Sequence, residues 1–149
     1  MGKYATKKIV RNIKYQGIPV YLENLAGSYR HWTDHNGKEG KTYMLYPYGF
    51  IRYTEAADGE GVDVYIGPDK RAKWAYVVRQ MVPDTQEYDE DKVMLGFSSY
   101  ADAKTAYLAQ YDDTRFFGWI DVYPVETFKR KVRQTLMHPG AVKAYIGLS

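Results

Sequence analysis

The stretch ADGEGVDVYIGP, residues 57–68, leads from a turn rich in glycine and acidic residues into a regular alternation of apolar and polar side chains. In an extended chain Val62, Val64 and Ile66 fall on one side and Asp63 falls on the other. This alternation predicts a half-buried strand. Asp63 is therefore expected to point away from the core.

Further extended segments are predicted on both sides of this strand. Ile18–Leu22 is rich in β-branched and aromatic residues and is bounded by glycine. The polar residues 28–40 predict a hairpin or a long loop before a second extended segment, Lys41–Tyr53. Trp74–Val82 and Val93–Phe97 are two more strand candidates. About five short strands are thus expected before any helix.

Helical signals occur only in the later part of the chain. Ser99 is a candidate N-cap, with Asp102 three positions after it, and predicts a first helix. A second helix is predicted to begin near Pro124 and to end before Pro139. Its apolar stripe consists of Val125, Phe128, Val132 and Leu136.

The order of these elements, strands first and helices afterwards, predicts the α+β class. The simplest arrangement is a small antiparallel OB-like β-barrel of about five strands, with two C-terminal helices packed outside it. Residues 1–149 are expected to form a single domain, with a basic lead-in over about residues 1–14.

Composition excludes some kinds of site. The chain has no cysteine, which excludes thiolate zinc sites and cysteine nucleophiles. It has no long apolar run, so a soluble protein is expected.

The charges are segregated along the chain. Residues 1–30 carry six basic groups and one acidic group, and residues 55–91 carry ten acidic and four basic groups. Such a separation allows an acidic metal site to face cations that hold an anion.

The carboxylates Asp58, Glu60 and Asp63 can converge on one point, because the glycines between them let the backbone turn tightly. Clustered carboxylates repel unless a cation lies among them, and oxygen ligands without histidine or thiolate suit Mg²⁺ or Mn²⁺. A second acidic group within residues 84–91 ends just before Lys92. It either supplies the other side of a two-metal phosphoryl-transfer site or forms an exposed turn.

Residues 46–68, YPYGFIRYTEAADGEGVDVYIGP, resemble the signature region of the soluble family I inorganic pyrophosphatases, in which a YPxNYGYI-type segment runs into a DGDPxDV motif. Outside this region, YLEN, GSYR and YDEDKVMLGF are similar to the compact pyrophosphatase-like domains of phage and mobile-element polyvalent proteins. The chain departs from the family at Glu60, in place of aspartate, and at Gly61, in place of proline. No lysine follows Tyr107 or Tyr111, near the place of the family's Tyr-Lys pair.

This resemblance implies a divalent-metal-dependent phosphoanhydride hydrolase that converts inorganic pyrophosphate to phosphate, with Mg²⁺ or Mn²⁺ as its cofactor. The implied metal ligands are Asp58, Asp63, either Asp89 or Glu90, and Glu23. The implied catalytic residues are Glu60, as the base that deprotonates the attacking water, and Lys92, Tyr48 and Arg30, which would contact the phosphate oxygens.

Two other functions stay open. The departures at Glu60 and Gly61 and the missing lysine favour a pyrophosphatase-fold binding protein, or a virion-associated phage protein, with little or no catalysis. The sixteen tyrosines and the basic N-terminus also suit an OB-like nucleic-acid-binding module. The expected partners are pyrophosphate or another small phosphoanhydride, and a phage virion or a larger polyvalent assembly, but no membrane. The expected location is the bacterial cytoplasm or the virion.

Overall fold

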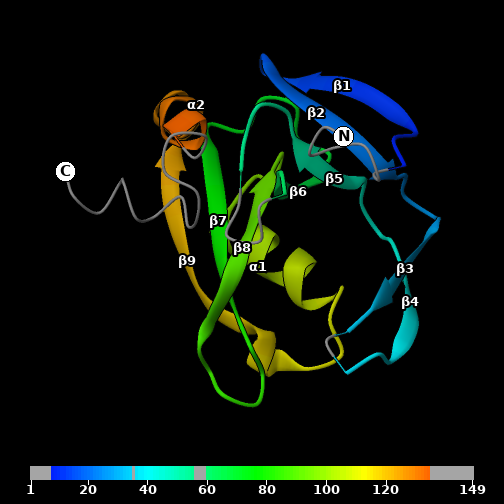
Figure 1. The fold of residues 1–149 in the computed structure, drawn as a ribbon. Helices are drawn as coiled ribbons and strands as arrows, with labels where there is room; N and C mark the ends of the chain where they lie inside the picture. Colours follow the sequence, from blue (N-terminus) through cyan, green and yellow to red (C-terminus); the bar gives the residue numbers. More distant parts are fainter. Residues whose placement is uncertain (1–7, 35, 56–59, 135–149) are drawn as a thin grey trace.

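The computed structural model describes residues 8–34, 36–55 and 60–134, which form one large sheet, one separate hairpin and two helices (Figure 1). The strands are β1 (Arg11–Tyr15), β2 (Ile18–Asn24), β3 (Tyr29–Thr33), β4 (Glu39–Tyr43), β5 (Tyr48–Ile51), β6 (Val62–Ile66), β7 (Trp74–Met81), β8 (Tyr88–Leu95) and β9 (Phe117–Pro124). The helices are α1 (Tyr100–Leu108) and α2 (Val125–Arg133), with a short 3₁₀ turn, η1, at Thr114–Phe116. No helix within these ranges is long and apolar enough to span a membrane.

The α+β class is confirmed, but a closed barrel is not what forms. The main sheet has seven strands in the order β1-β2-β5-β6-β8-β7-β9, and its described edge strands β1 and β9 do not pair with each other. Neighbouring strands are antiparallel, except that β6 and β8 are parallel. The parallel pair arises because the chain leaves β6, forms β7 one position further out, and returns through β8 between them.

The predicted strands are found, with some changes of extent. The segments predicted over 18–22, 62–66 and 74–82 correspond to β2, β6 and β7, and the segment predicted over 93–97 overlaps the end of β8, which begins earlier, at Tyr88. Of the hairpin or long loop predicted over 28–40, it is the hairpin that forms, as β3–β4. The segment Lys41–Tyr53 is divided between β4 and β5, which belong to different sheets, with Pro47 in the connection. Strands β1 and β9 were not predicted.

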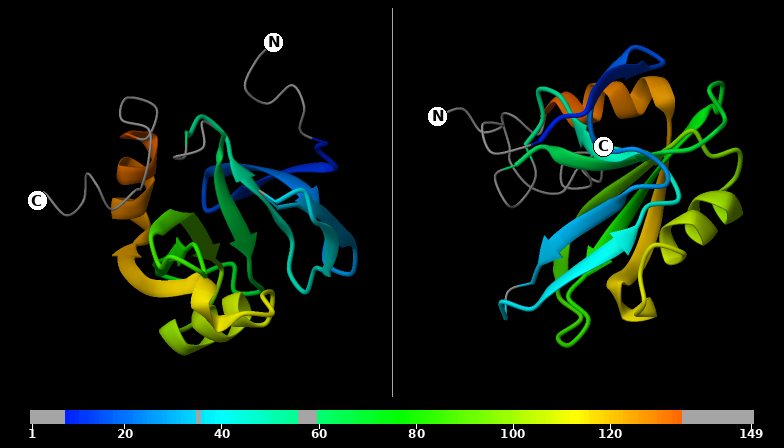
Figure 2. Two further views of the ribbon diagram at one scale, coloured as in Figure 1. Left: turned by 60° about the horizontal axis from the view of Figure 1, so that its bottom comes forward. Right: turned by 90° about the vertical axis from the view of Figure 1, so that its right-hand side faces the viewer.

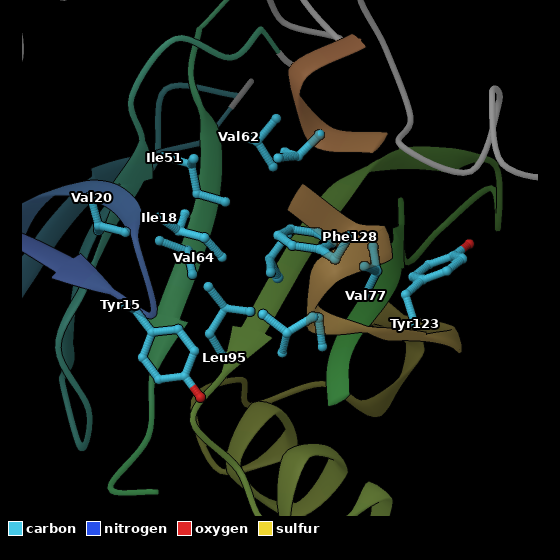
Figure 3. Close-up of a cluster of buried hydrophobic side chains, with 14 of the residues drawn as sticks. Tyr15, Ile18, Val20, Ile51, Val62, Val64, Val77, Leu95, Tyr123 and Phe128 are labelled. Carbon is cyan, nitrogen blue, oxygen red and sulfur yellow. The ribbon is translucent and has the colours of Figure 1, made fainter. Parts of the chain in front are cut away.

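Both faces of the main sheet are covered by packed side chains. On one face α2 covers the cluster shown in Figure 3, which includes Tyr15, Ile18, Val64, Val77 and Phe128. On the other face α1 packs over a second cluster, which includes Tyr65, Tyr76, Val78, Met94 and Tyr107. The sheet therefore lies between two helical layers, and the face to which Asp63 was expected to point, away from the core, is covered as well.

The ends and faces of the helices follow the sequence pattern. Ser99 is the N-cap of α1, and its hydroxyl accepts a hydrogen bond of 3.1 Å from the Asp102 backbone N–H. In α2 Val125, Phe128 and Val132 are buried, as predicted from their spacing, whereas Leu136 lies outside the described residues. Strand β9 lies between the two helices in the chain. They therefore do not form one C-terminal pair.

Arg79 of β7 is fully buried on the α2 face and is held by a group of polar side chains. Its guanidinium donates hydrogen bonds to Asp91 (2.8 Å), Asp121 (2.9 Å) and the Tyr123 hydroxyl (3.0 Å). Tyr88 donates to the other oxygen of Asp91 (2.8 Å). Burial alone would lower the pKa of Arg79, but Asp91 and Asp121 raise it, so this buried group stays ionised. We call these five residues the Arg79 cluster.

Gly49 of β5 lies so close to β2 that a Cβ atom would overlap the Tyr21 carbonyl oxygen. The substitution Gly49→Ala is therefore expected to lower the free energy of unfolding by about 2 kcal/mol, because two strands must move apart. Urea denaturation followed by circular dichroism measures this loss. Gly37→Ala is the comparison, because its added methyl group meets open space and only the left-handed φ of 81° opposes it. Equal losses for the two variants would contradict the steric explanation.

Candidate functional site

Lys92 of β8 is the centre of a group of polar side chains on the α1 face of the sheet. Its side chain is only 5% exposed. The ammonium nitrogen donates hydrogen bonds to Asp63 Oδ2 (2.7 Å) and to the Tyr48 hydroxyl (2.9 Å), and it lies 2.6 Å from Glu90 Oε1. Because an ammonium group has three N–H donors, these contacts use all of them.

The pairing of the strands brings these residues together. Asp63 of β6 and Lys92 of β8 are direct partners in the parallel pair. Glu90 precedes Lys92 by two positions on the same strand and therefore points to the same face. Tyr48 of β5 is the partner of Tyr65, two residues after Asp63. Four side chains from three adjacent strands thus reach one point.

Arg30 brings a second cation to this group from the separate β3–β4 hairpin. Its guanidinium carbon lies 5.0 Å from the centre of the Tyr48 ring, which is within the range of a cation–π contact. Arg30 also lines a cavity of about 570 Å³ together with Glu23, at the end of β2. The structure therefore places Glu23 in a cavity that adjoins the Lys92 group through Arg30.

Tyrosines surround the remaining side of the group. The hydroxyls of Tyr65 and Tyr111 are 3.3 Å apart, and Tyr107 stacks on Tyr111 with ring centres 4.5 Å apart. Tyr107 donates a hydrogen bond of 2.7 Å to Gln80. Burial raises the pKa of Tyr48, Tyr65 and Tyr111 well above the ordinary value, so their hydroxyls stay protonated and can donate hydrogen bonds.

The charges of the group depend on one another. Burial alone would lower the pKa of Lys92, but Asp63 and its other neighbours raise it well above the ordinary value. Burial opposes ionisation of Asp63, but Lys92 outweighs it and lowers the pKa of that carboxyl. Burial raises the pKa of Glu90 to about 7, despite Lys92, and Asp63 adds to this rise. When Glu90 is protonated, it donates a hydrogen bond to Asp63.

The remaining predicted site residues are Asp89, Glu60 and Asp58. Asp89 is exposed and accepts a hydrogen bond of 3.3 Å from Gln80. Glu60 is half-buried just before β6, and Asp58 lies outside the described residues. Of the alternatives Asp89 and Glu90, it is Glu90 that contacts Lys92.

The acidic run over 84–91 combines the two interpretations given to it. Asp84 and Glu87 lie exposed in the β7–β8 connection, whereas Glu90 and Asp91 belong to β8. Asp91 points to the opposite face and joins the Arg79 cluster. The run is therefore a turn at its beginning and a strand at its end, and the strand divides its carboxylates between two sites.

Four residues around this group, Tyr65, Gln80, Tyr107 and Tyr111, were not among the predicted site residues. The signal for Tyr65 was present in the sequence, because it alternates with Val64 on the same face as Asp63. Gln80 had no such signal. Its contact with Tyr107 depends on how α1 packs on β7.

Comparison with known families adds to this geometry. A family model described as Inorganic Pyrophosphatase matches residues 1–133. This chain belongs to the inorganic pyrophosphatase family. The resemblance inferred from residues 46–68 is confirmed, and membership supports a pyrophosphatase-type hydrolase at the level of the family. The comparisons with curated proteins and with solved structures gave no match.

Inorganic pyrophosphatases generally use Mg²⁺, so the site must be compared with the needs of that ion. Among the described residues no three His, Cys, Asp or Glu side chains form a group that could hold a metal. Asp63 Oδ2 and Glu90 Oε1 nevertheless lie 2.7 and 2.6 Å from the same Lys92 nitrogen, so two hard oxygen donors meet at one point. A divalent cation binds favourably to such a pair, because its charge offsets the repulsion between the two carboxylates. The chemistry of these two donors therefore fits Mg²⁺.

Proposed function

We propose that this protein hydrolyses inorganic pyrophosphate to phosphate in a reaction that requires Mg²⁺ or Mn²⁺. The observation that carries the proposal is the convergence of Lys92, Asp63, Glu90 and Tyr48 on one buried point, beside Arg30, in a chain of the inorganic pyrophosphatase family. Cations and neutral hydroxyls bind phosphate oxygens, and carboxylates bind hard cations. The group contains both kinds of ligand.

Lys92, Arg30 and Tyr48 would bind the phosphate oxygens. All three N–H groups of Lys92 are in use, so a phosphate oxygen must replace one of the present partners. The Tyr48 hydroxyl is the partner most easily replaced, because the two bonds to carboxylates are charge-assisted and stronger. Its release would leave Tyr48 able to donate its own hydrogen bond to the substrate. Arg30, against the Tyr48 ring, would then hold a second phosphate oxygen.

Asp63 and Glu90, together with Asp58, would hold the divalent cation. When it is bound, such an ion lowers the pKa of a coordinated water and neutralises charge on the phosphate oxygens. Glu23 and Asp89 would supply ligands at the edge of the site. Glu60 would accept the proton of the attacking water. Glu60 is one methylene group longer than the aspartate of the family motif. Its backbone must therefore lie further from the water whose proton the carboxylate accepts.

One observation favours the alternative of a binding protein without turnover. Lys92 already forms close contacts with both Asp63 and Glu90, and a lysine that neutralises two carboxylates reduces their need for a metal. Such a protein would bind pyrophosphate through Arg30 and Lys92 and release it unchanged. Calorimetric binding of pyrophosphate without phosphate release would identify this case.

Removal of the divalent cation tests the proposed reaction directly. The purified protein is expected to release phosphate from pyrophosphate in the presence of Mg²⁺ or Mn²⁺. Excess EDTA is expected to abolish this release, and added Mg²⁺ to restore it, because carboxylates alone do not stabilise the charge of the leaving phosphate. A colorimetric phosphate assay measures both steps. Release that continues in EDTA would contradict the metal requirement.

A further inference from the structure

Basic residues are concentrated in three segments of the described chain, 11–17, 67–73 and 125–133. These segments carry nine Lys and Arg residues and two carboxylates, whereas the other described residues carry nine basic and fifteen acidic groups. The nine residues are Arg11, Lys14, Lys70, Arg71, Lys73, Lys129, Arg130, Lys131 and Arg133. We call this set the basic end. Such a separation is large for a chain with a net charge of only +3.

The fold joins the three segments at one end of the molecule. The Gln16 side chain, in the β1–β2 turn, donates hydrogen bonds to the carbonyl oxygens of Lys70 (3.3 Å) and Ala72 (2.7 Å). The first N–H of α2 donates to the Lys73 carbonyl (3.0 Å). A methyl group at Gly17 would lie 3.7 Å from the Lys129 ammonium. The right-hand view of Figure 2 shows the β1–β2 hairpin and α2 both at the top of the molecule.

The positive charge of the basic end is accessible and little compensated. Seven of its nine side chains are exposed, and Lys129 and Lys131 are half-buried. Both carboxylates of these segments already accept hydrogen bonds. Asp69 accepts from the Arg71 backbone N–H and the Ser98 hydroxyl, and Glu126 accepts from Lys129. A positive potential therefore extends over surfaces from three separate parts of the chain.

We propose that the basic end binds nucleic acid through its phosphate backbone, without dependence on base sequence. Five of the nine cations are lysines, a residue depleted in protein–protein interfaces but common in contacts to phosphate. Seven of these cations are exposed, and exposed cations gathered on one region of a protein attract the phosphates of a duplex. None of Arg30, Tyr48, Asp63, Glu90 and Lys92 belongs to the basic end, so the inference does not depend on the proposed hydrolysis.

Fluorescence anisotropy with a short labelled DNA duplex tests the proposal. The unaltered protein is expected to bind at low salt, with an affinity that falls steeply as salt is added. The variant Lys70→Glu/Arg130→Glu changes exposed residues of two different segments. It is expected to bind about tenfold more weakly, and its plot of log affinity against log salt to be less steep by about two. Lys38→Glu/Lys104→Glu, with the same change of net charge outside the basic end, is expected to bind like the unaltered protein.

Three results would overturn the proposal. The first is a failure of the unaltered protein to bind the duplex at low salt. The second is an equal loss in both variants, which would show that only net charge matters. The third is tighter binding of a polyglutamate peptide than of DNA at equal salt, which would assign the surface to an acidic protein. Circular dichroism of each variant verifies that the fold is retained.

Discussion

Replacing Lys92 by methionine is expected to lower kcat/KM for pyrophosphate by about two to three orders of magnitude. Methionine keeps the length of the side chain but removes the ammonium group, which contacts Asp63, Glu90 and Tyr48. The loss should be mainly in kcat, because the cation is needed most when charge develops on the phosphate oxygens. Steady-state phosphate release measures it. The comparison is Lys104→Met. Lys104 is a half-buried lysine of α1 whose ammonium lies over the Phe117 ring, and its replacement is expected to change kcat/KM less than twofold.

A second measurement with the Lys92→Met protein separates a role in the site from damage to the fold. Without the ammonium, Asp63 and Glu90 face each other with less compensation, so Mg²⁺ should raise the melting temperature of this variant more than that of the unaltered protein. In Asp63→Asn the effect of Mg²⁺ should be smaller, because a ligand is lost. Full activity of Lys92→Met, or an equal effect of Mg²⁺ in all three proteins, would contradict the proposed site.

Replacing Arg79 by methionine is expected to lower the free energy of unfolding by about 3–5 kcal/mol, because Asp91 would be left buried without its charge partner. Urea denaturation measures the loss. The comparison is Arg115→Met. Arg115 contacts Asp113 and Asp84 on the surface, and exposed ion pairs contribute little to stability. No shift of the denaturation midpoint is therefore expected there.

The double variant Arg79→Met/Asp91→Leu tests the reason for that loss. Removing both members of a buried pair and filling the space with apolar atoms is far less costly than removing one member. The double variant is therefore expected to regain most of the stability that Arg79→Met loses. If it is as unstable as the single variant, the packing of the arginine stem rather than its charge explains the effect.

The sequence predicted those parts of the fold whose signals are local. The alternation in β6, the apolar stripe of α2 and the Ser99 cap each depend on a few neighbouring residues. Strand β1 escaped prediction because an edge strand of the sequence RNIKY is mostly polar and exposed. Strand β9 is covered unevenly on its two faces, so its residues show no clear period. The open sheet also depends on the position of β7 outside β8, which no local pattern specifies.

The candidate site was predictable as a set of residues but not as an arrangement. Alternation puts Asp63 on the side of its strand opposite Val62 and Val64, and Lys92 on the side opposite Val93 and Leu95. That these two sides are one face of one sheet follows from the parallel pairing of β6 with β8. This contact joins segments 29 residues apart in the chain. The approach of Arg30 depends likewise on where the β3–β4 hairpin lies against β5.

Strand β8 sends Glu90 and Lys92 to one side of the sheet and Asp91, between them, to the other. A shift of this strand by one residue would exchange the two sides, placing Asp91 beside Asp63 and Lys92 opposite Arg79. Like charges would then meet on both faces. The Arg79 cluster thus opposes misalignment of the strand. Relatives of this protein should therefore tolerate insertions and deletions in the connection over residues 82–87, but not within the strand itself.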